Sequence, residues 1–252
     1  MTGAMEGYRN ALLAKLDELW AAEGAALERA ADLCAESLAN KGVIHIYDTG
    51  HLISHELIAR TGGLVAYSRL NLVEPSDVNS LWRSRQIAEG QATVSGLDVE
   101  RGLVDWLVAK AVLKAGDVLI IGSVSGTGTR PVELALRARE HGLKVIAITA
   151  PAFSAQLKSS HPSGKRLFEA GDVLLDNHAP YGDSFLKVPG LETLICPVSG
   201  VSAAVLMWTL TAGIVERLVN RGLEPSVFRS INLPDGPTLV QEVESRYRER
   251  GL

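Results

Sequence analysis

The feature that most constrains this chain is an apolar run that ends abruptly in hydroxyls and glycines. Residues 117–133 read DVLIIGSVSGTGTRPVE, and an amphipathic helical pattern begins at the proline. This pattern indicates a β-strand that passes through a tight loop into an α-helix. Unpaired N–H groups at a helix start, together with the positive end of the helix dipole, favour a phosphate or another oxyanion. The sequence therefore predicts a phosphate site that lacks a lysine.

The signatures of two common phosphate loops do not occur. The chain has no Gly-x-x-x-x-Gly-Lys-Ser/Thr string, and its first predicted strand ends in DTGH rather than in Gly-x-Gly-x-x-Gly. A loop lined by hydroxyls suits a small phosphate monoester better than a nucleotide. The alternative is an ordinary strand-to-helix turn, in which Ser, Thr and Gly are common.

Composition narrows the classes of partner. The 252 residues carry a formal net charge of -4, whereas nucleic acid and anionic membranes require clustered Lys and Arg. We expect neither nucleic acid nor membrane as a partner, and we interpret the apolar segment 198–219 as a buried or interface helix. Two cysteines without metal-ligand spacing, and no evident export signal, favour a cytoplasmic protein with no metal ion and no cofactor.

Alternating strand and helix patterns predict the fold class. We expect an α/β fold with an open, doubly wound, parallel five-stranded sheet in the flavodoxin-like order 2-1-3-4-5, flanked by helices and preceded by a long N-terminal helix. The long helix is predicted at 6–40. The strands are predicted at 43–47, 64–67, 118–121, 144–148 and 173–175, with a possible sixth at 193–196. The other helices are predicted at 53–60, 78–89, 100–114 and 131–141.

No linker divides the chain, so we predict one domain over 1–252. It comprises an N-terminal helical extension (1–41), an α/β core (42–236) and a C-terminal helix (237–252). In the assumed strand order, the loops after the first and third strands face each other across one crevice, where ligands of such sheets bind.

The loop at 122–133 resembles the Ser-x-Ser-Gly phosphosugar loop of the sugar isomerase (SIS) domain family. Residues 49–51, 55–60 and 62–63 are similar to that family's first loop and helix. Residues 182–183, 196–199 and 229–232 resemble a little-characterised subset of SIS proteins likened to phosphoheptose isomerases. The similarity extends from the N-terminal helix to about Tyr247.

The resemblance implies a sugar phosphate as partner and a homodimer or homotetramer with sites near subunit interfaces. Many members interconvert aldose and ketose phosphates, some cleave ethers, and others only sense sugar phosphates. An isomerase that acts through an enediol is our first prediction. A non-catalytic phosphosugar sensor and an amino-sugar-phosphate lyase or etherase are the alternatives.

The first loop departs from the family pattern. Asp48 stands where the family commonly has glycine, and Leu52 stands where it has serine. A carboxylate beside a phosphate dianion is unfavourable unless it binds hydroxyls, a cation or a protonated group. The ligand is therefore an unusual sugar, or its phosphate lies entirely on the second loop.

Isomerisation needs a base and a second proton carrier. Glu56 is the predicted base, and its alternative role is an ion pair with Arg60 at i+4. His51 in the first loop, or His178 after the fifth strand, is predicted to move the second proton. His55 would point about 100° away from Glu56 on a helix. The remaining histidines are predicted to be a core or sheet-face residue (His45) and surface or loop residues (His141 and His161).

Binding residues are predicted at the ends of the first and third strands and at the start of the apolar C-terminal helix. Arg130 is predicted to clamp phosphate in bidentate fashion. Ser199 and Ser202 either cap the apolar helix or add hydroxyls to the sugar site. The full predicted binding set is Asp48, Gly50, Ser123, Ser125, Gly126, Thr127, Thr129, Arg130, Ser199 and Ser202.

Overall fold

The structure is a computed structural model that describes residues 3–49, 53–72, 96–110 and 112–252. The helix predicted at 78–89 and the candidate residues Gly50 and His51 lie outside the described residues, as does Leu52.

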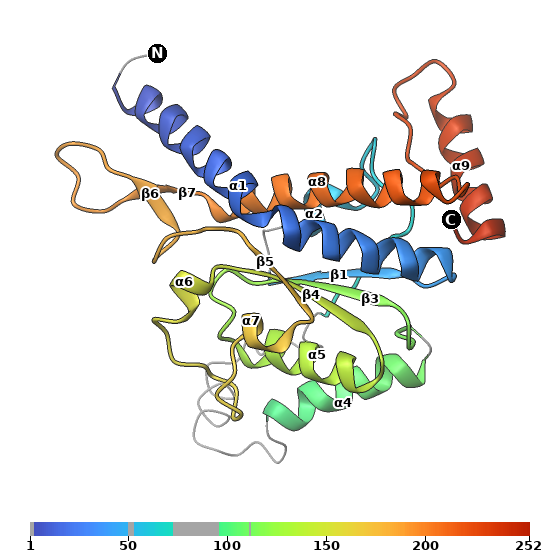
Figure 1. Cartoon of the computed structure of the whole chain (residues 1–252), viewed down its shortest axis with the longest axis horizontal. Coiled ribbons are helices and arrows are strands. Elements are labelled where there is room, and N and C mark those ends of the chain that lie inside the picture. The colour runs from blue at the N-terminus through green and yellow to red at the C-terminus, as the bar shows by residue number, and fades with distance from the viewer. Residues whose placement is uncertain (1–2, 50–52, 73–95, 111) are drawn as a thin grey trace, which may run out of the picture.

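A five-stranded sheet forms the centre of the fold (Figure 1). Its strands are β1 (Ile44–Asp48), β2 (Tyr67–Arg69), β3 (Val118–Gly122), β4 (Lys144–Thr149) and β5 (Val173–Asp176). They pair in parallel in the order β2-β1-β3-β4-β5. The predicted fold class and strand order are confirmed.

Helices cover both faces of the sheet because successive strand residues point to opposite sides. On one face, Ile120 and Ile146 share a buried cluster with α1 (Ala4–Ala39) and α8 (Ser199–Asn220). On the other, Leu119 and Ile121 pack with α4 (Gly96–Ala109), α5 (Thr129–Glu140) and α7 (Leu167–Ala170). Both layers are visible in Figure 1. Continuous apolar strands such as Val-Leu-Ile-Ile-Gly of β3 follow from this two-sided burial.

Long helices α1 and α8 lie side by side (Figure 1). By length and composition α8 alone among the described helices could cross a membrane. Its buried side chains, including Leu206, Leu210 and Ile214, instead join those of α1 in the core. The N-terminal part of α1 extends past the sheet, where Tyr8 contacts Phe185 with ring centroids 5.7 Å apart.

Two predicted elements that follow β1 differ from the structure. The helix predicted at 53–60 is only α2 (Ser54–Leu57), because the chain after it pairs with another segment: Phe228 accepts the N–H of Gly62 at 2.8 Å and donates to Gly63 at 2.9 Å. The second strand begins at Tyr67, and Leu64 forms an isolated bridge with Val227 instead.

The possible sixth strand belongs to a separate small sheet. β7 (Ile195–Pro197) pairs antiparallel with β6 (Ser184–Leu186), outside the parallel sheet. The remaining helices are α6 (Pro151–Ser154) and the C-terminal α9 (Gly236–Arg250).

Candidate functional site

The loops that follow β1 and β3 begin at adjacent positions of the sheet. Asp48 and Gly122, the last residues of these strands, are paired in the parallel ladder. After β1, α2 contacts α8 on one face, whereas after β3, α5 lies on the other. This reversal is the topological switch point at which open α/β sheets bind ligands.

The loop between β3 and α5 presents backbone donors. The N–H groups of Ser125, Gly126, Thr127 and Gly128 have no hydrogen-bond acceptor among the described residues, and no side chain caps the start of α5. The Ser125 Oγ and Thr127 Oγ1 atoms lie 3.4 Å apart on the same loop. We call residues 123–129 the phosphate loop from here on.

The carbonyl oxygens of the phosphate loop are bonded to neighbouring segments. The carbonyl of Val124 accepts the Thr149 hydroxyl at 3.0 Å and the N–H of Ala150 at 3.0 Å. The carbonyls of Gly126 and Thr127 accept N–H groups from residues 160–167, each at 2.8 Å. A trans peptide group is planar and its C=O and N–H point in opposite directions. Fixing these carbonyls therefore directs the N–H groups of the next residues to the open side of the loop.

Gly126 is required by this geometry. Its φ is +59°, which residues with a side chain rarely adopt. A Cβ at this position would lie 2.7 Å from Thr149 Oγ1 and 3.0 Å from the Leu167 Cβ. The glycine lets the phosphate loop pack directly on the residues that hold its carbonyls.

A cavity of about 440 Å³ opens at the carboxyl ends of β1 and β2, and it is lined in part by Arg130, the residue that follows the phosphate loop. Its polar lining comprises Asp48, Thr49, Ser54, His55, Arg69, Asn71 and Arg130. We call it the crevice cavity. It combines basic side chains, hydroxyls and an amide, the kinds of group that bind hydroxylated and anionic ligands.

Asp48 acts within the protein at the start of α2. Its Oδ2 atom accepts the backbone N–H groups of Ile53 at 3.1 Å and Ser54 at 2.6 Å. A carboxylate is favourable at a helix start because it accepts otherwise unpaired donors. The departure from the family loop thus has a local structural role.

Arg130 is tied to α4. Its Nε lies 3.0 Å and 2.8 Å from the two carboxylate oxygens of Glu100, and one terminal nitrogen donates to the carbonyl of Leu72 at 3.3 Å. Burial raises the pKa of the neighbouring Tyr47 phenol, and the positive charge of Arg130 opposes that rise. The described contacts orient Arg130 at the cavity wall, and its role as a phosphate clamp stays a prediction.

The predicted proton-transfer groups are not brought together among the described residues. Glu56 lies 3.5 Å from Arg60, its alternative partner, and does not line the crevice cavity, whereas His55 does. The ring nitrogens of His178 lie 3.1 Å from Glu18 and 3.2 Å from Glu23, both on α1. Their catalytic roles stay predictions.

The start of α8 is capped by Asp183, to which one of the two predicted serines is bonded. Ser199 Oγ donates to Asp183 at 2.6 Å, and Asp183 also accepts the backbone N–H of Ser199 at 2.9 Å. Ser202 Oγ is buried and has no hydrogen-bond partner in the described part of the chain. Neither serine lines the crevice cavity. A cap at α8 was one of the two predicted roles, but Asp183 supplies the carboxylate.

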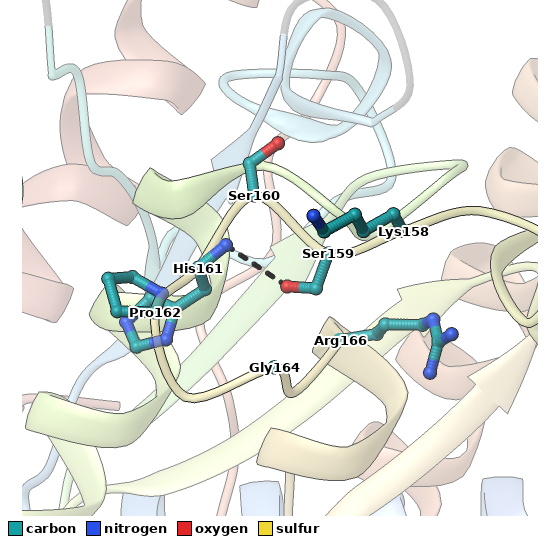
Figure 2. A pocket seen from close by; sticks show the side chains of 7 residues that line it. All are labelled: Lys158, Ser159, Ser160, His161, Pro162, Gly164 and Arg166. Atoms are coloured by element: carbon teal, nitrogen blue, oxygen red, sulfur yellow. Dashed lines mark hydrogen bonds between the residues drawn. The ribbon is translucent and has the colours of Figure 1, made fainter.

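One buried cluster was missed by sequence reasoning. His161, predicted to be a surface or loop residue, does lie in a loop but is only 5% exposed, so the expected surface position was wrong. Its Nε2 lies 2.6 Å from Glu133 Oε2, and the other oxygen of Glu133 accepts from Arg101 Nε at 2.8 Å. The available signal was Glu133 itself, a carboxylate on the apolar side of the predicted helix. Figure 2 shows His161 beside Pro162, with the Arg166 guanidinium directed away from them.

Within the described part of the chain, no group of three or more His, Cys, Asp or Glu side chains is arranged to hold a metal ion.

The fold and the loop define a doubly wound α/β protein with backbone donors at its switch point. The SIS domain model matches residues 7–150, and the chain belongs to the SIS domain family. It is 36% identical to a UPF0309 protein of Listeria innocua over 218 residues, which cover 86% of this chain and 84% of that protein. A UPF0309 protein of Brucella canis is 31% identical over 252 residues, which cover 99% and 98% of the two chains.

In structure the chain is similar to a phosphoheptose isomerase from Neisseria gonorrhoeae. The TM-score is 0.49 and the identity 19%, over 83% of this chain and 96% of that chain.

Proposed function

We propose that this SIS protein binds a phosphorylated sugar, with the phosphate on the phosphate loop and the sugar in the crevice cavity. The observation that carries the proposal is the run of four N–H groups at Ser125–Gly128 that find no acceptor within the described residues, beside carbonyls that neighbouring segments hold. Such donors at the start of α5 suit a dianion because the helix dipole adds a favourable potential. The hydroxyls of Ser125 and Thr127 add further donors.

The crevice cavity supports the sugar part of this proposal. Its volume of about 440 Å³ lies within the range of small-molecule sites. His55, Arg69 and Asn71, which line it, carry donors and acceptors for sugar hydroxyls. Asp48 is hydrogen-bonded to the start of α2, which reduces its conflict with a nearby dianion.

Aldose–ketose isomerisation through an enediol is the catalytic form of this proposal. His55 lines the cavity and is therefore added to Glu56, His51 and His178 as a candidate proton carrier. A phosphosugar sensor needs only the binding site. We further propose a homodimer or homotetramer, because Leu13 and Trp20 on α1 are 47% and 52% exposed and would be covered by a second copy. The free cysteines Cys34 and Cys196 support our proposal of a cytoplasmic location.

A thermal-shift screen tests the binding proposal. The probes are five-, six- and seven-carbon aldose and ketose phosphates, each paired with its unphosphorylated sugar. A ligand at a hundredfold excess over Kd stabilises the folded state by about 2.7 kcal/mol. We expect shifts with phosphorylated sugars alone, reduced in Ser125→Ala. Equal shifts with the unphosphorylated sugars, or none with any compound, would contradict the proposal. Incubation of each binder, followed by NMR of the sugar, separates isomerisation from binding alone.

A further inference from the structure

A segment outside the predicted site is bonded to the back of the phosphate loop. We call residues 158–167 the cover segment. The N–H of Ser160 donates to the carbonyl of Thr127, and the N–H of Leu167 donates to the carbonyl of Gly126, both at 2.8 Å. The Thr129 hydroxyl donates to the carbonyl of Ser160 at 3.3 Å. Two of the carbonyls whose orientation sets the phosphate-loop donors are therefore held by this segment.

Peptide geometry connects the cover segment to the proposed anion donors. The carbonyl of Gly126 shares a planar peptide group with the N–H of Thr127, and the carbonyl of Thr127 shares one with the N–H of Gly128. If the cover segment moved away, both peptide groups would be free to rotate. The donors would then lose their common direction toward an anion, and their preorganisation for it.

The cover segment is anchored by one buried hydrogen bond to α5. His161 follows Ser160 directly, and its side chain and that of Glu133 are 3% and 2% exposed. His161 Nδ1 accepts the N–H of Ser163 at 3.1 Å and lies 2.8 Å from the Ser163 hydroxyl. Nε2 is then the ring nitrogen that donates to the Glu133 carboxylate, at 2.6 Å. Arg101 satisfies the other oxygen of Glu133 at 2.8 Å.

The segment is also closed on itself. Ser159 Oγ donates to the carbonyl of Lys165 at 2.6 Å and accepts the N–H of His161 at 3.0 Å (Figure 2). The turn is therefore tied to itself by hydrogen bonds. Two buried side chains join the cover segment to the α5 layer: His161 through its hydrogen bond to Glu133, and Leu167 through the apolar cluster that it shares with α5.

We propose that His161 and Glu133 are positioning residues for phosphate binding. Their buried hydrogen bond keeps the cover segment on the carbonyls of Gly126 and Thr127, and thereby keeps the N–H groups of Thr127 and Gly128 directed at the anion. This inference rests on the proposed function, because it assigns the two residues to the same phosphate site.

The experiment compares His161→Leu, His161→Asn and His161→Gln by two-dimensional amide NMR, with titration of inorganic phosphate. His161→Leu fills the space of the imidazole ring but has no hydrogen-bond donor, and the amide of His161→Asn is too short to reach Glu133. His161→Gln places an amide N–H at nearly the position of the imidazole Nε2. We expect His161→Leu and His161→Asn to weaken phosphate binding by about tenfold, which corresponds to the loss of one hydrogen bond to the charged phosphate. His161→Gln should retain most of the wild-type affinity.

Hydrogen exchange supplies a readout that simple loss of packing would not reproduce. In His161→Leu and His161→Asn the amides of Ser160 and Leu167 should exchange faster than in wild type. In His161→Gln they should regain their protection. His141→Leu is the matched control. Like His161, His141 lies next to a carboxylate, with its Nε2 3.1 Å from Asp105 of α4. It stands at the C-terminal end of α5, away from the phosphate loop. It should change neither phosphate binding nor the exchange of these two amides.

The outcomes separate the two proposals. Suppose that the wild-type protein binds phosphate at the phosphate loop and that His161→Leu and His161→Asn bind it with unchanged affinity. This result would overturn the positioning inference and leave the proposed function intact. If His161→Leu does not fold, the phosphate affinity of His161→Asn alone tests the positioning inference in the same way. If phosphate and the sugar phosphates leave the amides of Ser125–Gly128 unshifted in wild type, the proposed function fails, and the positioning inference fails with it.

Discussion

The carboxylate of Asp48 accepts the backbone N–H of Ser54 at 2.6 Å, across the turn between β1 and α2. The same oxygen accepts the N–H of Ile53 at 3.1 Å. A residue that departs from the family loop therefore holds the first turn of α2. This relationship explains how a carboxylate is accommodated next to a site proposed for a dianion, since part of its charge is compensated by backbone donors.

Replacing Asp48 should therefore cost stability. Asp48→Ala removes the acceptor for two N–H groups, and we expect a loss of about 1 kcal/mol in the free energy of unfolding, as for other helix caps. Asp48→Asn keeps an acceptor oxygen and should lose less. Urea denaturation of both variants checks this. A loss of phosphosugar affinity with no loss of stability in either variant would instead assign Asp48 to the ligand.

The phosphate loop should tolerate a methyl group at one glycine and not at the other. Gly126→Ala places a Cβ 2.7 Å from Thr149 Oγ1 at a φ of +59°, and we expect a loss of about 1–3 kcal/mol together with weaker phosphate binding. Gly128→Ala is the control. The φ of Gly128 is −68°, and the nearest atom to an added Cβ would be the Pro131 Cδ at 3.4 Å. Thermal unfolding of the two variants measures the difference. Equal stabilities would show that the loop is not held as described.

Asp117 should make stability depend on pH. It is buried, which tends to raise its pKa, but hydrogen bonds from His45 and from the N–H groups of Val43 and Lys114 hold the pKa below its usual value. A carboxylate with a lowered pKa stabilises the folded state above its unfolded pKa, and this stabilisation is lost as the pH falls through the folded pKa.

Asp117→Asn should accordingly be less stable than wild type near neutral pH. The difference should shrink as the pH falls below about 4, the usual pKa of aspartate. Urea denaturation at a series of pH values gives the two curves. A difference that stays constant down to acidic pH would mean that Asp117 stabilises the fold without its charge.

His178 is expected to link α1 to the end of β5. Its ring nitrogens lie 3.1 Å from Glu18 and 3.2 Å from Glu23. His178→Ala removes both contacts, whereas Lys15 still pairs with Glu18 and the N–H of Asp176 still donates to Glu23. We expect a loss of about 1 kcal/mol in stability, the usual net contribution of a hydrogen bond, and phosphosugar binding close to that of wild type. Abolished turnover with unchanged stability would instead favour the catalytic role predicted for His178.

The parallel sheet was predictable because its signals are local. Strands β3 and β4 are continuous apolar runs, and the glycines and hydroxyls that follow β3 mark the start of α5 within a few residues. The predicted switch point followed from strand order alone and is confirmed by the pairing of Asp48 with Gly122. The position of the phosphate loop thus required no knowledge of distant contacts.

The differences arise where long-range contacts override local pattern. The helix after β1 is short because residues 62–65 pair with residues 226–228, far along the chain. The burial of His161 depends on Glu133, whose Oε2 lies 2.6 Å from the His161 Nε2 although the two residues are 28 positions apart in the sequence. Neither partner is visible in a local window of sequence, since the loop at 158–166 has no periodicity that marks one of its residues as buried.

The most direct test of the central claim is the amide NMR spectrum of the wild-type protein during titration with a sugar phosphate that stabilises it. The account predicts that the largest shifts occur at the N–H groups of Ser125, Gly126, Thr127 and Gly128, and that inorganic phosphate shifts the same amides. A sugar phosphate that binds while these four amides stay unshifted would contradict it, because the anion would then lie away from the start of α5.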